Sequence, residues 1–227
     1  MLSIIRNKIY NKERISDDEC KYLFYNVDLG ELMIMASEVR KRYNGDNVYY
    51  IKNIHVEPTN ICENKCKFCS YSSSISGKYF NYSIEEIIGK LKDIIENVSE
   101  VHITGGVNRY YDLNYYSKLF KEIKLLKEDI HIKALTAEEI DFISRISNSS
   151  IENVLRILVA CGLDTIAGGG AEIFNENIRK QICKDKISGY RWLEIHKIAH
   201  RLGIKSNATM MYGHIESVDD IVEHLKL

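Results

Sequence analysis

Three cysteines lie close together in the stretch NICENKCKFC, residues 60–69: Cys62, Cys66 and Cys69. Thiolates at such short spacing are ligands for Zn²⁺ or for an iron–sulfur cluster. A structural zinc site usually takes four ligands from two paired arms, and no second C-x2-C arm follows here. The later H-x3-H pair, His196 and His200, lies on an expected helix and lacks the Glu of an H-E-x-x-H metal site. A 4Fe–4S cluster normally takes four thiolates, so three leave one iron open to a substrate. The spacing therefore favours a cluster with one open iron over zinc.

The other three cysteines are scattered along the chain, at Cys20, Cys161 and Cys183. We interpret Cys20 and Cys161 as small buried hydrophobic residues. Cys183 is an alternative fourth ligand, although no second thiol accompanies it. Scattered cysteines in a chain without a signal peptide do not indicate a disulfide framework.

Composition and charge narrow the class of protein. The 227 residues are 45% hydrophobic and 28% charged, which suits a soluble globular domain with a substantial core. The formal net charge of -1 gives no electrostatic argument for nucleic acid or an anionic membrane as a partner. No apolar run approaches the ~20 residues needed to cross a bilayer. The N-terminus also lacks the continuous apolar region of a signal peptide, so we expect a cytoplasmic protein.

Short apolar or β-branched runs alternate with helical segments along most of the chain. Capping boxes at Ser83–Glu86 and Thr136–Glu139 open helices, and apolar stripes run over 116–123 and 192–202. The expected strands are 53–58, 101–106, 131–136, 163–170 and 204–214. This alternation predicts an α/β fold, a parallel (βα) partial TIM-type barrel that is incomplete at about five strands.

The first 50 residues contain none of these strands. Their pattern, with a capping box from Ser16 to Glu19, predicts two short helices. We therefore expect a helical extension over residues 1–50 and the barrel over 51–227. A new helix begins near Ser217 and the sequence ends two turns later, so we expect the barrel to be truncated at its C-terminal end.

In parallel βα folds, functional groups gather at the carboxyl ends of the strands. The cysteine loop follows the first expected strand, Gly105-Gly106 end the second, and Gly168, Gly169 and Gly170 end the fourth. Glycines there allow the backbone to approach a ligand closely. His55 and Glu57 alternate along the first strand and share one face, which we expect to line the interior and to serve catalysis.

The loop C-x3-C-x-Φ-C after the first strand of a βα barrel resembles that of the radical SAM superfamily. The resemblance implies that S-adenosylmethionine chelates the open iron of a 4Fe–4S cluster held by the three cysteines. It also implies that the Gly105-Gly106 pair meets the methionine amino group, although the acid that often follows is Val107 here. Phe68 would pack beside the adenine or the cluster, and Ser70 and Tyr71 would shape the cavity wall.

Two further segments are candidate parts of the S-adenosylmethionine site. The resemblance implies packing of residues 210–216 along the adenine, which singles out Met210, Tyr212, Gly213 and Glu216. Glu172 follows the triple glycine and is a candidate acceptor of hydrogen bonds from ribose hydroxyls. A solvated loop acid is the alternative interpretation of Glu172.

Longer stretches resemble one branch of the superfamily. HVEPTNICENKCKFCSYS, HITGG, HIKALTAEEIDF, AGGGAEIFNENIRKQICKDK and WLEIHKIAHRLGIKSNATMMYGHIE are similar to aminofutalosine synthases of the futalosine route to menaquinone. That resemblance implies addition of the 5′-deoxyadenosyl radical to an enol-ether benzoate, 3-(1-carboxyvinyloxy)benzoate, with S-adenosylmethionine consumed as co-substrate. It implies an electron donor such as flavodoxin or ferredoxin. The sister dehypoxanthine futalosine cyclases, and a truncated non-catalytic iron–sulfur fragment, are the alternatives.

Overall fold

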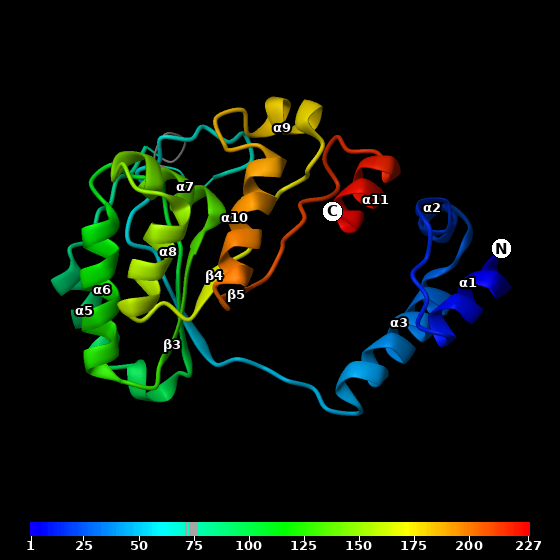
Figure 1. Cartoon of the computed structure of the whole chain (residues 1–227), viewed down its shortest axis with the longest axis horizontal. Coiled ribbons are helices and arrows are strands. Elements are labelled where there is room, and N and C mark those ends of the chain that lie inside the picture. Colours follow the sequence, from blue (N-terminus) through cyan, green and yellow to red (C-terminus); the bar gives the residue numbers. More distant parts are fainter. Residues whose placement is uncertain (71, 73–76) are drawn as a thin grey trace. The chain divides into compact units, whose positions relative to one another are not determined.

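The computed structural model describes residues 1–70, 72 and 77–227, so Tyr71 and its expected place in the cavity wall lie outside the described residues. Five strands form one parallel sheet (Figure 1). Their order along the sheet is their order along the chain, as successive crossovers of one hand produce. The strands are β1 (Asn53–Val56), β2 (Glu100–Ile103), β3 (His131–Thr136), β4 (Thr165–Ala167) and β5 (Lys205–Ser206). The α/β partial-barrel prediction is confirmed.

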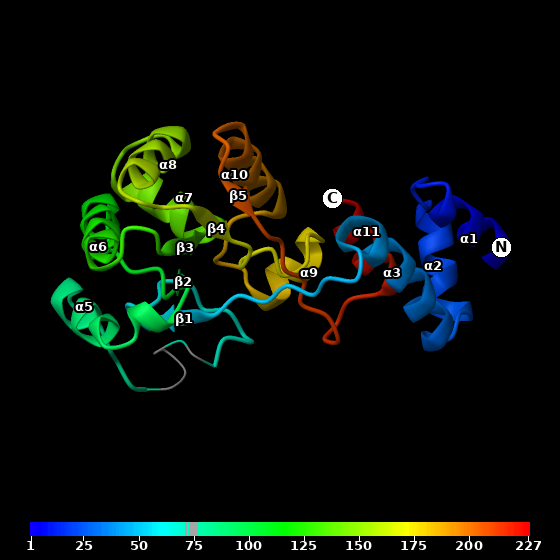
Figure 2. The ribbon, with the colours of Figure 1, turned by 90° about the horizontal axis from the view of Figure 1, so that it is seen from below.

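Helices connect the strands and cover one face of the sheet. Figure 2 shows α5, α6, α8 and α10 in a row along that face. Two short helices sit elsewhere: η1 (Ile95–Asn97) precedes β2, and α9 follows β4. The helix bounds are α5 (Ile84–Lys92), α6 (Leu113–Leu126), α7 (Ala137–Ile146), α8 (Ile151–Ala160), α9 (Glu176–Ile182) and α10 (Gly189–Arg201). The capping boxes at Ser83 and Thr136 begin α5 and α7, as predicted.

The two faces of the sheet differ in polarity because side chains alternate along each strand. Val101 and Ile103 of β2 are fully buried, and so is Ile132 of β3; all three belong to the main apolar core with the helices. His102 and Lys133 lie between these positions and so point to the opposite, inner face. The core therefore sits between sheet and helices, and the inner face stays polar.

Most strands end earlier than predicted, and the fifth is much shorter than the expected 204–214. Only Lys205 and Ser206 pair with β4. Strand β4 itself ends at Ala167, before the triple glycine, so the chain after Ser206 has no ladder partner on that side. Met210, Tyr212 and Gly213 consequently lie outside any strand, which corrects the strand prediction for this segment.

The chain divides into two compact units, Ile51–Met211 and a helical unit of Met1–Tyr50 with Tyr212–Leu227. The helical unit contains α1 (Leu2–Tyr10), α2 (Asp17–Asn26), α3 (Leu29–Asn44) and α11 (Val218–Lys226). Two helices were predicted in the first 50 residues and three are present, because Asp28 caps a further helix by accepting from the Glu31 amide. Lys226 pairs with Asp17 at 2.8 Å and thereby joins α11 to α2. The predicted boundary after residue 50 stays a prediction.

Gly106 is the point where the loop after β2 meets the cysteine loop. A Cβ at Gly106 would lie 2.2 Å from the carbonyl oxygen of Ile61, and this backbone has no flexible end that can move aside. We expect Gly106→Ala to lower the free energy of unfolding by about 2 kcal/mol or more, measured by urea unfolding. The control is Gly89→Ala in the open part of α5, which should gain up to about 1 kcal/mol from helix propensity. Equal effects of the two substitutions would contradict the packing argument.

Candidate functional site

A cavity of about 250 Å³ lies within the barrel unit and is lined by the loops that follow β1 to β4. Its lining brings together three cysteines, four glycines, four carboxylates and one lysine. These residues are Cys62, Cys66, Cys69, Gly105, Gly106, Gly169, Gly170, Glu57, Glu138, Glu139, Glu172 and Lys186. The carboxyl ends of the parallel strands thus gather the predicted cysteine loop and both glycine loops at one site.

The three cysteines enter this cavity in different environments. Cys66 is almost fully buried, and burial raises the pKa of its thiol to about 12, while the charge of Lys186 opposes that rise. Burial also raises the pKa of Cys62, whose sulfur accepts a hydrogen bond from the Val107 amide at 3.3 Å. A metal ion bound to such a thiol deprotonates it, so the raised pKa values describe the free thiols.

The donor set of the cavity fits an iron–sulfur cluster. Cys62, Cys66 and Cys69 come from one loop and line the same cavity. Thiolates are the donors that a 4Fe–4S cluster takes. Within the described part of the chain, no three Cys, His, Asp or Glu side chains are grouped around a single point that could hold one metal ion.

Cys183 lies behind the cysteine loop. It is buried in an apolar cluster with Cys66, Ile173, Ile178 and Ile182, and it does not line the cavity. The same region holds the loop by its backbone: the Lys67 amide donates to the Ile182 carbonyl at 2.9 Å. Cys183 therefore contributes to the wall that supports Cys66, which gives no support to its role as a fourth ligand.

The glycines of the two loops have two separate functions. Gly106 and Gly168 allow close backbone packing, because a Cβ at Gly168 would lie 2.2 Å from the Asn207 carbonyl oxygen. Gly106 also lines the cavity, together with Gly105, Gly169 and Gly170, and Gly170 has a φ of 86°, which favours glycine. Gly168 itself is not part of the cavity lining.

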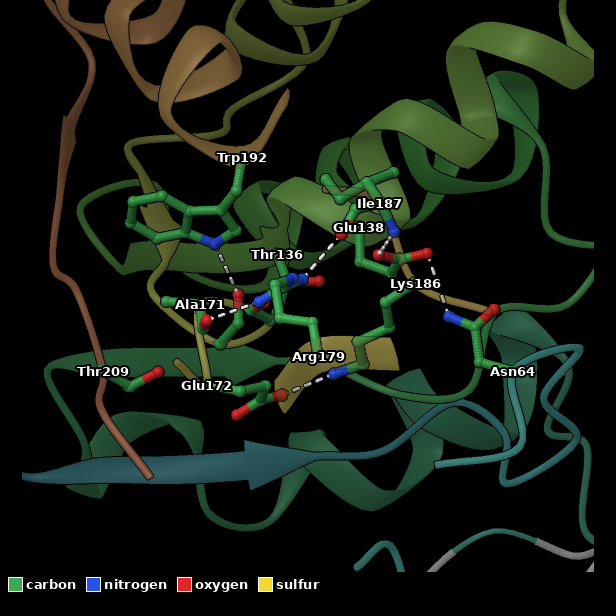
Figure 3. A network of polar contacts seen from close by, with 12 residues as sticks. Asn64, Thr136, Glu138, Ala171, Glu172, Arg179, Lys186, Ile187, Trp192 and Thr209 are labelled. Carbon is green, nitrogen blue, oxygen red and sulfur yellow. Dashed lines mark hydrogen bonds and ion pairs between the residues drawn. The ribbon is translucent and has the colours of Figure 1, made fainter. Parts of the chain in front are cut away.

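A buried arginine that sequence reasoning missed holds the loop after the triple glycine. Arg179 is 2% exposed, and its guanidinium donates to four backbone carbonyls, of which those of Ala171 and Ile187 belong to residues labelled in Figure 3. Its acceptors are Gly170, Ala171, Ile173 and Ile187, at 2.6–3.2 Å. A fork of five N–H donors suits this role. No signal in the sequence indicates this role, because Arg179 lies beside Lys180 in the mostly polar helix ENIRKQI.

Two glutamates follow β3, and they tie this strand's loop to its neighbours. Glu138 accepts from the Asn64 side chain and from the Ile187 amide, both at 2.9 Å, and so links the cysteine loop to the segment before α10 (Figure 3). Glu139 accepts from the Gly105 amide at 3.1 Å while it also completes the capping box with Thr136. Sequence reasoning recognised Glu139 only as a helix cap.

Glu172, the predicted ribose acceptor, lines the cavity but is bound to Lys186 at 2.5 Å (Figure 3). Both side chains are nearly buried. Burial opposes the charge of Lys186, yet the nearby Glu172 and Cys66 outweigh it and raise the pKa of the lysine. Glu172 also has a φ of 47°, uncommon for a residue with a side chain. The solvated-acid alternative for Glu172 is therefore wrong, and its ribose role stays a prediction.

The remaining predicted site residues occupy different places. Phe68 and Glu57 line the cavity, and Phe68 is 38% exposed. His55 does not line it, but its Nε2 lies 3.0 Å from Oγ1 of the lining residue Thr104. Met210 lies outside the lining, and Tyr212, Gly213 and Glu216 belong to the helical unit. The adenine contacts expected of residues 210–216 stay a prediction.

Comparison with protein families matches residues 56–227 to the model of the radical SAM superfamily. This chain belongs to the radical SAM superfamily. The match begins at the end of β1 and includes all three cysteines of the cavity. Within the described residues, no helix of this superfamily member is long and apolar enough to cross a membrane.

Curated relatives and solved structures add detail to this assignment. The chain is 36% identical to an aminodeoxyfutalosine synthase of Thermus thermophilus, over 97% of the chain and 60% of the relative. It is also 36% identical to a 5-amino-6-(D-ribitylamino)uracil–L-tyrosine 4-hydroxyphenyl transferase of Methanococcus aeolicus, over 95% and 61%. The chain thus spans about three fifths of these relatives. The crystal structure of methylornithine synthase matches with a TM-score of 0.78 and 17% identity, over 97% of this chain and 63% of the other.

Glu139 makes the stability of the fold depend on pH. Burial raises its pKa from 4.5 to about 7, although hydrogen bonds from Thr136 and Gly105 oppose the rise. The folded state therefore binds more protons than the unfolded state, and stability falls as pH rises from about 4.5 to about 7, by up to about 3 kcal/mol. When urea unfolding is measured between pH 5 and pH 8, we expect the free energy of unfolding of Glu139→Gln to change less with pH than that of the wild type.

The matched control is Glu128→Gln, at an exposed acid in the loop between α6 and β3, which should leave the wild-type pH dependence in place. An unchanged slope in the Glu139→Gln protein would contradict the assignment of this pH dependence to Glu139.

Proposed function

We propose that this chain provides the barrel of a radical SAM enzyme that joins the 5′-deoxyadenosyl group of S-adenosylmethionine to 3-(1-carboxyvinyloxy)benzoate, giving aminofutalosine for menaquinone biosynthesis. The observation that carries the proposal is the 36% identity to an aminodeoxyfutalosine synthase along 97% of the chain. The cavity supports it, because the cysteines and both glycine loops meet there. The activity of the protein as a whole is part of the proposal.

In this proposal Cys62, Cys66 and Cys69 hold a 4Fe–4S cluster. When bound, the cluster supplies the electron that splits S-adenosylmethionine, and the open iron supplies its anchoring point. The chain's own contribution is binding and orientation. Thiolates from one loop would hold the cluster, and Gly105 and Gly106 line the same cavity, next to Cys62.

The charges of the cavity favour a cationic ligand. Four carboxylates line it, from Glu57, Glu138, Glu139 and Glu172, against the single cation Lys186. S-adenosylmethionine carries a sulfonium and an ammonium group, and low-dielectric walls strengthen their attraction to carboxylates. The acid that often follows the glycine pair in this superfamily is Val107 here, and Glu139 supplies a carboxylate beside Gly105 from the next strand.

Arg179 and Glu138 act as positioning residues in this proposal. Arg179 fixes the carbonyls of the loop beyond the triple glycine, and Glu138 fixes that region to the cysteine loop. A rigid set of loops holds reacting groups in one geometry, which is the protein's main contribution when cofactors carry the chemistry. An electron donor such as flavodoxin or ferredoxin completes the proposal.

A second candidate function has equal sequence identity behind it. The transferase of Methanococcus aeolicus is 36% identical to this chain, and its name gives tyrosine and 5-amino-6-(D-ribitylamino)uracil as reactants. The sister cyclase reaction and a non-catalytic cluster-binding fragment are further alternatives. All of them retain the three cysteines as cluster ligands, so the substrate is what separates them.

Anaerobic reconstitution of the chain with iron and sulfide tests the proposal. We expect about four irons per chain and, with S-adenosylmethionine, dithionite and the enol-ether benzoate, a product with the mass of aminofutalosine. Cys66→Ala should lose most of the iron. Cys161→Ala, at a buried cysteine at the end of α8, should keep it and serves as the control.

Each alternative has its own result. A product from tyrosine and 5-amino-6-(D-ribitylamino)uracil, with none from the benzoate, would favour the second candidate. Iron without any product from either set of substrates would favour the sister cyclase reaction or the non-catalytic fragment. A single bound zinc and no iron would overturn the cluster assignment itself.

A further inference from the structure

A row of basic side chains crosses the inner face of the sheet, one layer below the cavity. His55 of β1 pairs in register with His102 of β2, and His102 pairs with Lys133 of β3. Residues in register on neighbouring parallel strands point to the same face. We call His55, His102 and Lys133 the basic row.

The basic row adjoins the cavity directly. His55 Nε2 lies 3.0 Å from Oγ1 of Thr104, and Thr104 lines the cavity. The ring centroids of His55 and His102 are 5.0 Å apart, so the two imidazoles form one continuous surface. A small molecule that extends from the cavity toward the sheet would therefore meet this row first.

Two members of the row have unused hydrogen-bonding capacity. His102 Nε2 is buried and has no hydrogen-bond partner among the described residues. The Lys133 ammonium forms no hydrogen bond or ion pair within the described part of the chain. A buried nitrogen without a partner is destabilising, so the site gains from a ligand that accepts its hydrogen bond.

Two acids lie near the basic row, and each contacts a residue other than His102 and Lys133. Glu57 Oε1 lies 3.5 Å from His55 Nδ1, on the cavity side of the row. Glu100, one layer further from the cavity, accepts from the Asn53 side chain and lies 3.9 Å from His131 Nε2. Burial is the main cause that lowers the pKa of His102; the charges of His55 and Lys133 lower it further, and the charge of Glu100 opposes them. Among the described residues, no acid forms an ion pair with Lys133 or His102.

We propose that the basic row binds a carboxylate group of a small-molecule substrate, with His102 Nε2 and the Lys133 ammonium as the main donors. This rests on the proposed function, in which the cavity above the row holds S-adenosylmethionine. In this proposal the inner face has two regions of opposite charge. The carboxylates of the cavity attract the cationic groups of S-adenosylmethionine, and the basic row below attracts the carboxylate of the substrate. A substrate anchored by its carboxylate would direct its opposite end to the cavity.

The test uses benzoate as the carboxylate probe and benzamide as its neutral counterpart, with the ring signals of the seven histidines followed by NMR on the reconstituted chain. The His55→Gln and His102→Gln variants assign the two signals of the row. We expect benzoate to shift the His102 and His55 signals in a saturable way, and benzamide to leave them in place.

Substitutions at Lys133 sharpen the test. Lys133→Met should weaken benzoate binding by about tenfold or more, and Lys133→Arg should retain most of it, because it keeps the charge. The control Lys121→Met, at an exposed lysine of α6, should bind as the wild type does. Binding of S-adenosylmethionine, measured separately by calorimetry, should be the same in all four proteins.

The outcomes separate this inference from the proposed function. Absence of any benzoate-dependent shift at His102, or equal benzoate affinity in wild type and Lys133→Met, would overturn the basic row as a carboxylate site. If benzoate binds at the row but the enol-ether benzoate is neither bound nor converted, the row stands and the proposed function fails.

Discussion

Close backbone contact at two glycines determines how near the loops of this barrel can come to one another. Neighbouring strands of a sheet lie about 4.8 Å apart. The loops at their ends therefore start close together, and they can line one cavity only if their backbones pack closely. Gly106 provides this contact between the loops after β2 and β1, and Gly168 provides it between those after β4 and β5. The cysteines, the cavity-lining glycines and the carboxylates are brought together by these contacts.

Buried polar groups then fix the loops that the glycines allow to meet. Arg179 satisfies four carbonyls of irregular backbone, and Glu138 and Glu139 accept hydrogen bonds from segments on either side of β3. These side chains are buried and yet have partners, as buried polar groups must. The inner face is consequently organised by charge, with carboxylates around the cavity and the basic row beneath it.

Much of this arrangement could be predicted from the sequence. Alternation of apolar runs and capping boxes predicted the parallel fold, and the spacing of Cys62, Cys66 and Cys69 predicted the superfamily to which the chain belongs. The third N-terminal helix and the early end of β5 were not predictable in the same way, because they depend on a local cap and on the length of the neighbouring strand. Arg179 and Lys186 were missed because their partners are backbone carbonyls and a distant acid, which no local pattern reveals.

The apolar side chains behind Cys66 affect how long an iron–sulfur cluster bound in the proposed enzyme would survive in air. Ile173, Ile178 and Ile182 pack on the side of Cys66 that faces away from the cavity, and the Lys67 amide ties the cysteine loop to the end of α9. The apolar side chains therefore leave the cavity side as the main approach to the Cys66 thiol. In the proposed enzyme, a ligand that fills the cavity would close this approach and would help to protect the bound cluster from oxygen.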